Sequence, residues 1–220
     1  TQDGAFYAGL QGIHALTNSG LYPLEITGEL ADGTQVSHSQ LVLVRPRGYL
    51  FEVITVPPDL IDPEITNRED DFVRPMVNSH TDQKYWQGLF VSPSPCSTCI
   101  NSSFGNRRSY NGSAFTYFHG GVDFPPVSLE ITASADGKVV IAEFLEVRGN
   151  FTLIDHGWGI FSAYLHQSEI FVQAGEMVTA GQVIGLIGNT GRSTGAHLHW
   201  EIWAGGVQVN PLDWLDTLYP

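Results

Sequence analysis

The sequence predicts a mainly β protein: a small N-terminal β-sandwich of the Ig-like type, a helical connector and a C-terminal antiparallel β domain. Three features of the sequence predict this class. Apolar residues come in short runs, turn-forming residues separate these runs, and a helical period of apolar residues is found in one stretch. Short apolar runs with Gly, Pro or Asn between them are typical of strands.

The N-terminal β-sandwich-like domain is expected to span residues 1–65. Asn18-Ser19-Gly20 and Ala31-Asp32-Gly33-Thr34 supply turns, and Pro57-Pro58 ends the last strand because proline cannot donate to a ladder. The runs with strand character and no helical period lie at residues 21–26, 36–44 and 49–56.

A helical connector is expected at residues 66–87. Thr66 and Glu69 have the spacing of a capping box, in which two side chains satisfy the first backbone N–H groups of a helix. Phe72, Val73 and Met76 follow at helical intervals. The helix is expected to end at Trp86-Gln87-Gly88.

The C-terminal β domain is expected to span residues 88–220. Glycine is found at nearly every turn of this region, and no amphipathic helix is available for the crossovers that parallel strands need. The pattern therefore predicts an antiparallel sheet. Its expected strands are residues 128–133, 138–147, 151–155, 160–165, 182–187 and 197–203.

Charge and hydropathy exclude two classes of partner. The formal net charge is −13, and only ten Lys and Arg residues are spread over the 220 residues. Without a basic stripe to neutralise phosphates, nucleic acid is not expected as a partner. No apolar run approaches the roughly 20 residues of a membrane-spanning helix.

The two cysteines, Cys96 and Cys99, stand in a stretch rich in proline and serine. A structural zinc site needs four protein ligands, and no second Cys or His pair is nearby. A redox Cys-x-x-Cys motif normally opens a helix, whereas this one lies among turn formers. We therefore favour a local disulfide, which indicates an oxidising compartment.

Two clusters of residues carry candidate metal chemistry, His119-Gly-Gly-Val-Asp123 and His197-Leu-His199. In a strand, His197 and His199 project to the same face, about 6.5 Å apart. Imidazole is a common zinc ligand and a carboxylate is a suitable third partner. His119, Asp123 and one histidine of the pair therefore form a candidate three-ligand site, in which the fourth position holds water.

An ordered series of segments extends this pattern along the chain. The segments are Phe104–Arg108, His119–Phe124, Ala135–Val140, Tyr164–His166, Ala174–Gly188 and Asn189–Glu201. Any one segment is common, but their order is specific. The series resembles the LytM/lysostaphin-type zinc peptidases of family M23, which cut peptide cross-links in bacterial cell walls, and the resemblance covers roughly residues 88–220.

The resemblance implies a division of labour among the histidines. His119, Asp123 and His199 become the zinc ligands, while His166 and His197 become the two catalytic histidines beside the zinc. It further implies a zinc-dependent endopeptidase whose substrate is peptidoglycan peptides and whose location is extracytoplasmic, meaning secreted, periplasmic or bound to the cell wall.

Candidate substrate-binding residues flank these histidines. Asn189, Arg192, Ser193 and Thr194 belong to a glycine-punctuated loop before the histidine strand and are able to bond an extended peptide. Tyr117 precedes the first candidate ligand, and its hydroxyl is a candidate lining group for the groove, with surface packing as the alternative.

Two alternatives belong to other classes of protein. Residues 172–185 resemble a hairpin of biotinyl or lipoyl carrier domains, but Lys138, the nearest lysine, lacks their flanking signature. The second alternative is a zinc-binding, non-hydrolytic protein that binds the cell wall or regulates other wall enzymes. The N-terminal unit is a candidate for docking a partner protein or shielding the groove, and we expect a monomer.

Overall fold

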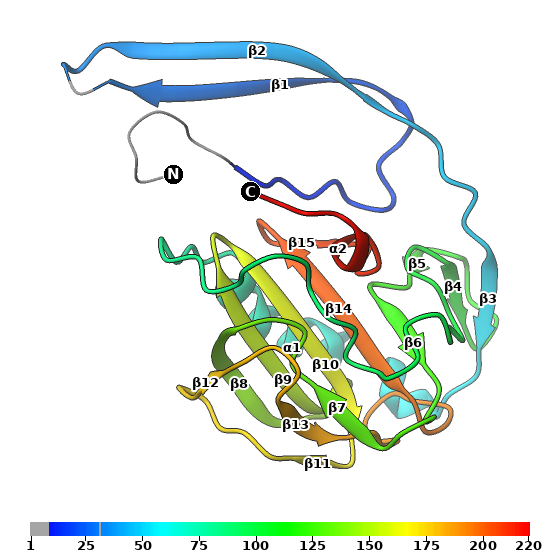
Figure 1. Ribbon diagram of the computed structural model, residues 1–220. Coiled ribbons are helices and arrows are strands. Elements are labelled where there is room, and N and C mark those ends of the chain that lie inside the picture. The colour runs from blue at the N-terminus through cyan, green and yellow to red at the C-terminus, as the bar shows by residue number, and fades with distance from the viewer. Residues whose placement is uncertain (1–8, 31) are drawn as a thin grey trace. The chain divides into compact units, whose positions relative to one another are not determined.

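A computed structural model describes residues 9–30 and 32–220 of the chain (Figure 1). These residues group into two compact units. One contains residues 50–220 together with 9–15, and the other spans residues 16–49. The predicted mainly β class is confirmed, and none of the described helices is long and apolar enough to span a bilayer.

The smaller unit is a two-stranded antiparallel sheet. Its strands are β1 (Gly20–Glu29) and β2 (Gln35–Val44), paired over their whole length. The predicted β-sandwich is wrong here, because a second sheet is not found among the described residues of 16–49 and most side chains of both strands are exposed. The predicted third strand, residues 49–56, pairs in the larger unit instead.

That strand, β3 (Phe51–Ile54), joins β4 (Arg107–Tyr110) and β5 (Tyr117–Phe118) in a three-stranded sheet. β3 runs parallel to β4, with Glu52 opposite Arg108. Two asparagine side chains secure its ends. Asn106 accepts a hydrogen bond from the backbone N–H of Leu50 at 3.3 Å, and Asn111 accepts one from Val56 at 3.0 Å.

The predicted helix is confirmed as α1 (Pro63–Val77), which follows a short 3₁₀ turn, η1 (Pro58–Ile61). It begins before the expected Thr66, because Asp62 caps it by accepting from the N–H of Glu64 and proline is favoured at the first helical position. It ends at Val77, well before Trp86. Val77 is buried against residues of the central sheet, so α1 packs on that sheet within the larger unit.

A seven-stranded antiparallel sheet forms the centre of the larger unit. Its order is β12-β8-β9-β10-β14-β15, and β6 also pairs with β14 (Figure 1). The bounds are β6 (Val122–Phe124), β8 (Gly137–Leu145), β9 (Gly149–Gly157), β10 (Ile160–Gln167), β12 (Met177–Val178), β14 (Leu198–Ala204) and β15 (Val207–Val209).

Smaller elements complete this unit. β11 (Glu169–Ile170), β13 (Val183–Leu186) and β7 (Glu130–Thr132) form a further three-stranded sheet, and α2 (Asp213–Asp216) lies near the C-terminus. All six strands predicted for the C-terminal domain are thus confirmed. That residues 88–220 form an independent peptidase domain, with boundaries at 65/66 and 87/88, stays a prediction.

The two faces of the central sheet bury different clusters. On β14, Leu198, Trp200 and Ile202 are fully buried in the larger apolar cluster. The alternate residues of β14, beginning with His199 and Glu201, face the other side, as strand geometry requires. The smaller cluster joins residues of β8, β9 and β10 to Val73 and Val77 of α1.

The disulfide is confirmed. The sulfur atoms of Cys96 and Cys99 are bonded across a separation of three residues. The bond closes a turn directly before Asn101 and Ser102, two residues that reach the candidate functional site. The cross-link therefore restricts a loop that carries polar groups toward that site.

His156 is a buried histidine of β9 outside the metal cluster. Its Nδ1 donates to the carbonyl of Asp136 at 2.8 Å, and its Nε2 contacts Oγ of Ser162 at 2.8 Å. Burial lowers the pKa of His156 from 6.5 to about 4, although the Asp136 carbonyl and neighbouring carboxylates favour the charged ring. The folded protein therefore holds this side chain neutral.

This burial predicts an acid-sensitive fold. Between pH 6.5 and about 4 the unfolded chain binds a proton at His156 that the folded chain does not. The free energy of unfolding should therefore fall as pH falls through this window, by up to about 3 kcal/mol from His156. Urea unfolding of the wild type and of His156→Gln at several pH values tests this.

The variant should show a shallower loss of stability between pH 6.5 and 4.5 than the wild type. His38→Gln, which changes an exposed histidine of β2, is the matched control and should keep the wild-type slope. Equal slopes for the wild type and His156→Gln would contradict the assignment.

Candidate metal centre

The three predicted metal ligands converge because β6 and β14 pair in register. Asp123 of β6 lies directly opposite His199 of β14, and His119 stands four residues before Asp123. The turn between them needs glycine at position 121. A Cβ added to Gly121 would lie 2.2 Å from the carbonyl oxygen of Trp200, so the close approach of these segments excludes a side chain.

Three potential ligand atoms face one point. Nε2 of His119 lies 3.0 Å from Oδ1 of Asp123 and 2.9 Å from Nδ1 of His199. Nδ1 of His199 lies 2.8 Å from the same Oδ1. All three residues are buried, and their ligand atoms form a cluster suited to hold a metal ion.

The outward-facing nitrogens of the two histidines fix their tautomers. Nδ1 of His119 lies 3.0 Å from the backbone carbonyl of Ser103, which can only accept a hydrogen bond. Nε2 of His199 lies 2.9 Å from Oε1 of Glu201. Each histidine thus donates its outer N–H and turns the lone pair of its other nitrogen inward.

Electrostatics at this point favour a positive charge. Burial lowers the pKa of His199, but Asp123 and Glu201 outweigh burial and raise it from 6.5 to about 9. Burial raises the pKa of Asp123, yet His119 and His199 hold it well below its usual value. Because the two inward imidazole nitrogens and the carboxylate oxygen lie within 3.0 Å of each other, either a proton on His199 or a metal ion in its place is held at this point.

The donor set fits zinc. Two imidazole nitrogens and one carboxylate oxygen are three protein ligands of the kind found in catalytic zinc sites, which leave the fourth position open. Calcium and magnesium prefer sites built from oxygen alone. His119, Asp123 and His199 would hold the ion, and Glu201 supports it through His199.

Two further histidines stand beside this cluster. The ring centroids of His166 and His197 lie 4.9 Å apart, and His166 lies 6.1 Å from the ring of His199. Nδ1 of His197 donates to the carbonyl of Gly195 at 2.7 Å, and Nδ1 of His166 donates to that of Thr190 at 2.8 Å. Nδ1 of each ring is therefore occupied, and Nε2 of His197 lies 3.6 Å from Oδ1 of Asp123.

His166 reaches the site through a local irregularity of β10. The pairing of β10 with β9 shifts register between Tyr164 and Gln167, and His166 has a positive φ of 63°. Such a bulge redirects a side chain that regular alternation would place elsewhere. Burial, followed by the charges of His197 and His199, lowers the pKa of His166 to about 3, so its imidazole is neutral at pH 7.

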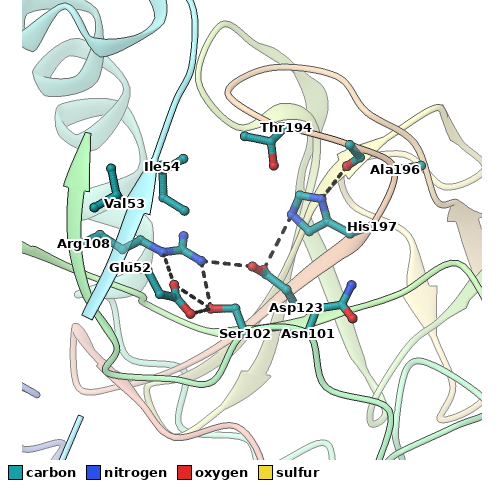
Figure 2. A pocket seen from close by; sticks show the side chains of 11 residues that line it. Glu52, Val53, Ile54, Asn101, Ser102, Arg108, Asp123, Thr194, Ala196 and His197 are labelled. Carbon is teal, nitrogen blue, oxygen red and sulfur yellow. Dashed lines mark hydrogen bonds and ion pairs between the residues drawn. The ribbon is translucent and has the colours of Figure 1, made fainter. Parts of the chain in front are cut away.

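A cavity of about 440 Å³ opens beside the cluster, lined in part by Asp123, His197 and Thr194 (Figure 2). Its opposite wall comes from β3 and β4 and includes Glu52 and Arg108. This wall was not predicted from the sequence. Glu52 lies 71 positions before Asp123 in the chain and a lone glutamate has no distinguishing spacing, while Arg108, in the segment Phe104–Arg108, was assigned no role at the site.

The predicted substrate-binding residues occupy different places. Thr194 lines the cavity, and Oγ of Ser193 lies 3.2 Å from Nδ1 of His197. Arg192 packs on the ring of Tyr110 at 4.7 Å, and Asn189 is exposed. Tyr117 is 46% exposed and packs edge-to-face with Tyr110, outside the residues that line this cavity. Contact with substrate stays a prediction for all five.

Comparison with known sequences places this site in a family. Residues 117–211, which contain all five predicted metal and catalytic residues, match the sequence profile of peptidase family M23. The chain carries a domain of peptidase family M23. The resemblance seen in the sequence motifs is therefore confirmed.

Curated relatives that match this part of the chain include proteins named as endopeptidases. The chain is 41% identical over 114 residues to peptidoglycan DD-endopeptidase ShyA of Vibrio cholerae, covering 51% of this chain and 26% of that protein. It is 40% identical over 117 residues to the DD-carboxypeptidase/endopeptidase Mpg of Neisseria meningitidis, covering 52% and 26%. The chain thus spans about a quarter of the length of these curated relatives.

The structural likeness to a solved protein extends beyond the matched segment. The crystal structure of a candidate peptidase M23 from Pseudomonas aeruginosa superposes with a TM-score of 0.65 at 25% sequence identity. The alignment covers 94% of this chain and 78% of that one. Segments before residue 117 therefore have counterparts in a second M23 structure.

The geometry predicts which histidines hold metal. His199→Ala should lower zinc affinity by on the order of 100-fold or more, because it removes a ligand rather than a supporting group. His197→Ala should keep one zinc per chain with an affinity within about tenfold of wild type. Zinc content after dialysis and competition with a chromophoric chelator measure both. Equal loss of zinc in the two variants would place His197 among the ligands.

Proposed function

We propose that this chain is a zinc-dependent endopeptidase that hydrolyses peptide cross-links of bacterial peptidoglycan. One observation carries the proposal. Two inward imidazole nitrogens and a carboxylate oxygen meet at a single point, and two further histidines, His166 and His197, stand beside it, with His197 lining a cavity. A site that only binds metal has no need of His166 and His197.

Zinc at this position would supply Lewis-acid polarisation of a carbonyl and a nucleophile at neutral pH. The chain's own residues then manage protons and orientation. His166 and His197 each bond a backbone carbonyl through Nδ1, which leaves Nε2 as the nitrogen available for proton transfer. Either imidazole is placed to accept a proton from attacking water and to return it to the leaving amine.

Backbone carbonyls orient both histidines. The carbonyls of Thr190 and Gly195 accept the Nδ1 protons, so Nε2 of each ring is left for the reaction. The pKa of His166, lowered to about 3 by burial and by its histidine neighbours, keeps this group in the neutral form that accepts hydrogen bonds.

The names of the relatives support the substrate class. ShyA is a peptidoglycan DD-endopeptidase and Mpg a DD-carboxypeptidase/endopeptidase. They favour a bond between D-amino acids as the one that this chain cuts. The cavity between β3 and the Thr194 loop has room for part of a peptide, and its walls mix the apolar Val53 and Ile54 with charged groups.

This substrate implies an extracytoplasmic location. Peptidoglycan lies outside the cytoplasmic membrane, and the Cys96–Cys99 disulfide suits an oxidising compartment. A secreted, periplasmic or wall-bound enzyme satisfies both. The large negative charge, −13, gives no means of binding nucleic acid.

Mass spectrometry of cross-linked peptidoglycan fragments tests the activity. The zinc-loaded protein should release new peptide termini, and removal of zinc by a chelator should stop the release. His166→Ala and His197→Ala should lower kcat by about 10²–10⁴-fold, because each removes a group that acts on the transferring proton. Glu143→Gln, which changes an exposed glutamate of β8, is the control variant with a predicted effect of less than tenfold.

The opposite result has a distinct meaning. A correctly folded, zinc-loaded chain that leaves every cross-linked fragment intact would contradict the proposal. Binding to intact peptidoglycan in the same preparation would then favour a non-hydrolytic cell-wall protein.

A further inference from the structure

Glu52 stands at the centre of a polar network behind the metal cluster. Its Oε1 accepts hydrogen bonds from Ser102 Oγ at 2.8 Å and Asn106 Nδ2 at 2.7 Å. Its Oε2 accepts one from Nε of Arg108 at 3.2 Å (Figure 2). The carboxylate comes from β3 and the other three groups from the segment that begins at Ser102 and ends in β4.

Arg108 connects this network to Asp123, one of the predicted metal ligands. One of its terminal nitrogens, Nη2, donates to Oδ2 of Asp123 at 3.0 Å, while Oδ1 of Asp123 faces the two histidines. The two oxygens of Asp123 therefore have separate partners. An oxygen held by a guanidinium is not available to a metal on the other side of the carboxylate.

Ser102 connects the same network to a second ligand. Its hydroxyl donates to Glu52 and accepts from Nη2 of Arg108 at 3.1 Å. It also lies 3.0 Å from Nδ1 of His119, whose proton it can accept together with the carbonyl of Ser103. One hydroxyl thus meets three charged or ligating groups with a consistent pattern of donors and acceptors.

The charges of this network balance. Arg108 is buried, with 13% of its side chain exposed, and an uncompensated guanidinium there would repel a cation held by Asp123. Glu52, 23% exposed at the side chain, supplies the opposite charge at 3.2 Å. Removing one member of such a pair leaves the other buried and unpaired, which is costly.

We propose that Glu52 and Arg108 are positioning residues of the metal centre. Arg108 holds Oδ2 of Asp123 so that only Oδ1 faces the ion, and Glu52 holds and neutralises Arg108. A carboxylate limited to one oxygen leaves the remaining coordination position free for chemistry. The inference rests on the proposed zinc site, and both residues lie before the matched segment 117–211.

The role of β3 follows from this assignment. The side chains of Asn106 and Asn111 bond the backbone at both ends of β3. These bonds hold the register of β3 on β4, in which Glu52 lies opposite Arg108. The strand is therefore part of the metal centre and not only a support for the segment before it. A change in β3 should reach the metal without touching any ligand.

Zinc affinity of three variants in the full chain tests the proposal. Arg108→Met and Glu52→Gln should each weaken zinc binding by about 10–100-fold, as loss of supporting groups does in metal sites. Because the two residues act through one network, the double variant should lose less affinity than the product of the single losses. Chelator competition gives these values, and Glu143→Gln, an exposed glutamate of β8, is the matched control.

X-ray absorption at the zinc edge provides a readout that a purely structural role would not change. In Arg108→Met the second oxygen of Asp123 is released, so the number of oxygen atoms in the first shell should rise relative to wild type. Arg108→Lys keeps the charge without the fork and should recover part of the affinity. It also serves as the test variant if Arg108→Met fails to fold.

Zinc affinities within twofold of wild type in Arg108→Met and Glu52→Gln, with an unchanged oxygen shell, would overturn the inference. None of these measurements requires turnover. If the wild type binds zinc but cuts no peptide, the proposed function fails while the variants still decide the role of Glu52 and Arg108.

Discussion

The meeting of three electron-pair donors at one buried point is the constraint on which the rest of the structure depends. Nε2 of His119, Nδ1 of His199 and Oδ1 of Asp123 lie 2.8–3.0 Å apart, and the outer nitrogen of each histidine is held by another partner. A proton on His199, whose pKa is raised to about 9, or a metal ion in place of that proton compensates the charges of Asp123 and Glu201. The fold thus holds three potential ligand atoms rigidly around one point.

The sheet supplies that rigidity. Pairing of β6 with β14 sets Asp123 against His199, while Trp200, the next residue of β14, is fully buried in the apolar cluster on the opposite face. Burying these polar side chains costs free energy, and the burial of apolar surface on the other side of the same strand offsets that cost. Around the ligands, every outer nitrogen has a partner. Glu201, Ser103, Gly195 and Thr190 determine which nitrogen of each histidine is free to act.

Much of this was predictable from the sequence, for a physical reason. The spacings of His119 to Asp123 and of His197 to His199 are local, so strand and turn geometry alone bring those side chains together. Glycine punctuation located the six main strands in the same way. The roles of Glu52 and Arg108 could not be predicted, because their meeting depends on the pairing of β4 with β3, a strand that was expected to belong to the N-terminal domain. The same long-range pairing explains why the expected sandwich is a two-stranded sheet.

The measurement that tests the central claim most directly is a crystal structure of the zinc-loaded chain with anomalous diffraction at the zinc edge. The account predicts one strong peak at about 2.0–2.2 Å from His119 Nε2, Asp123 Oδ1 and His199 Nδ1, with Oδ2 of Asp123 still bonded to Arg108. A peak elsewhere, or zinc bound through His166 or His197 in place of His199, would contradict it.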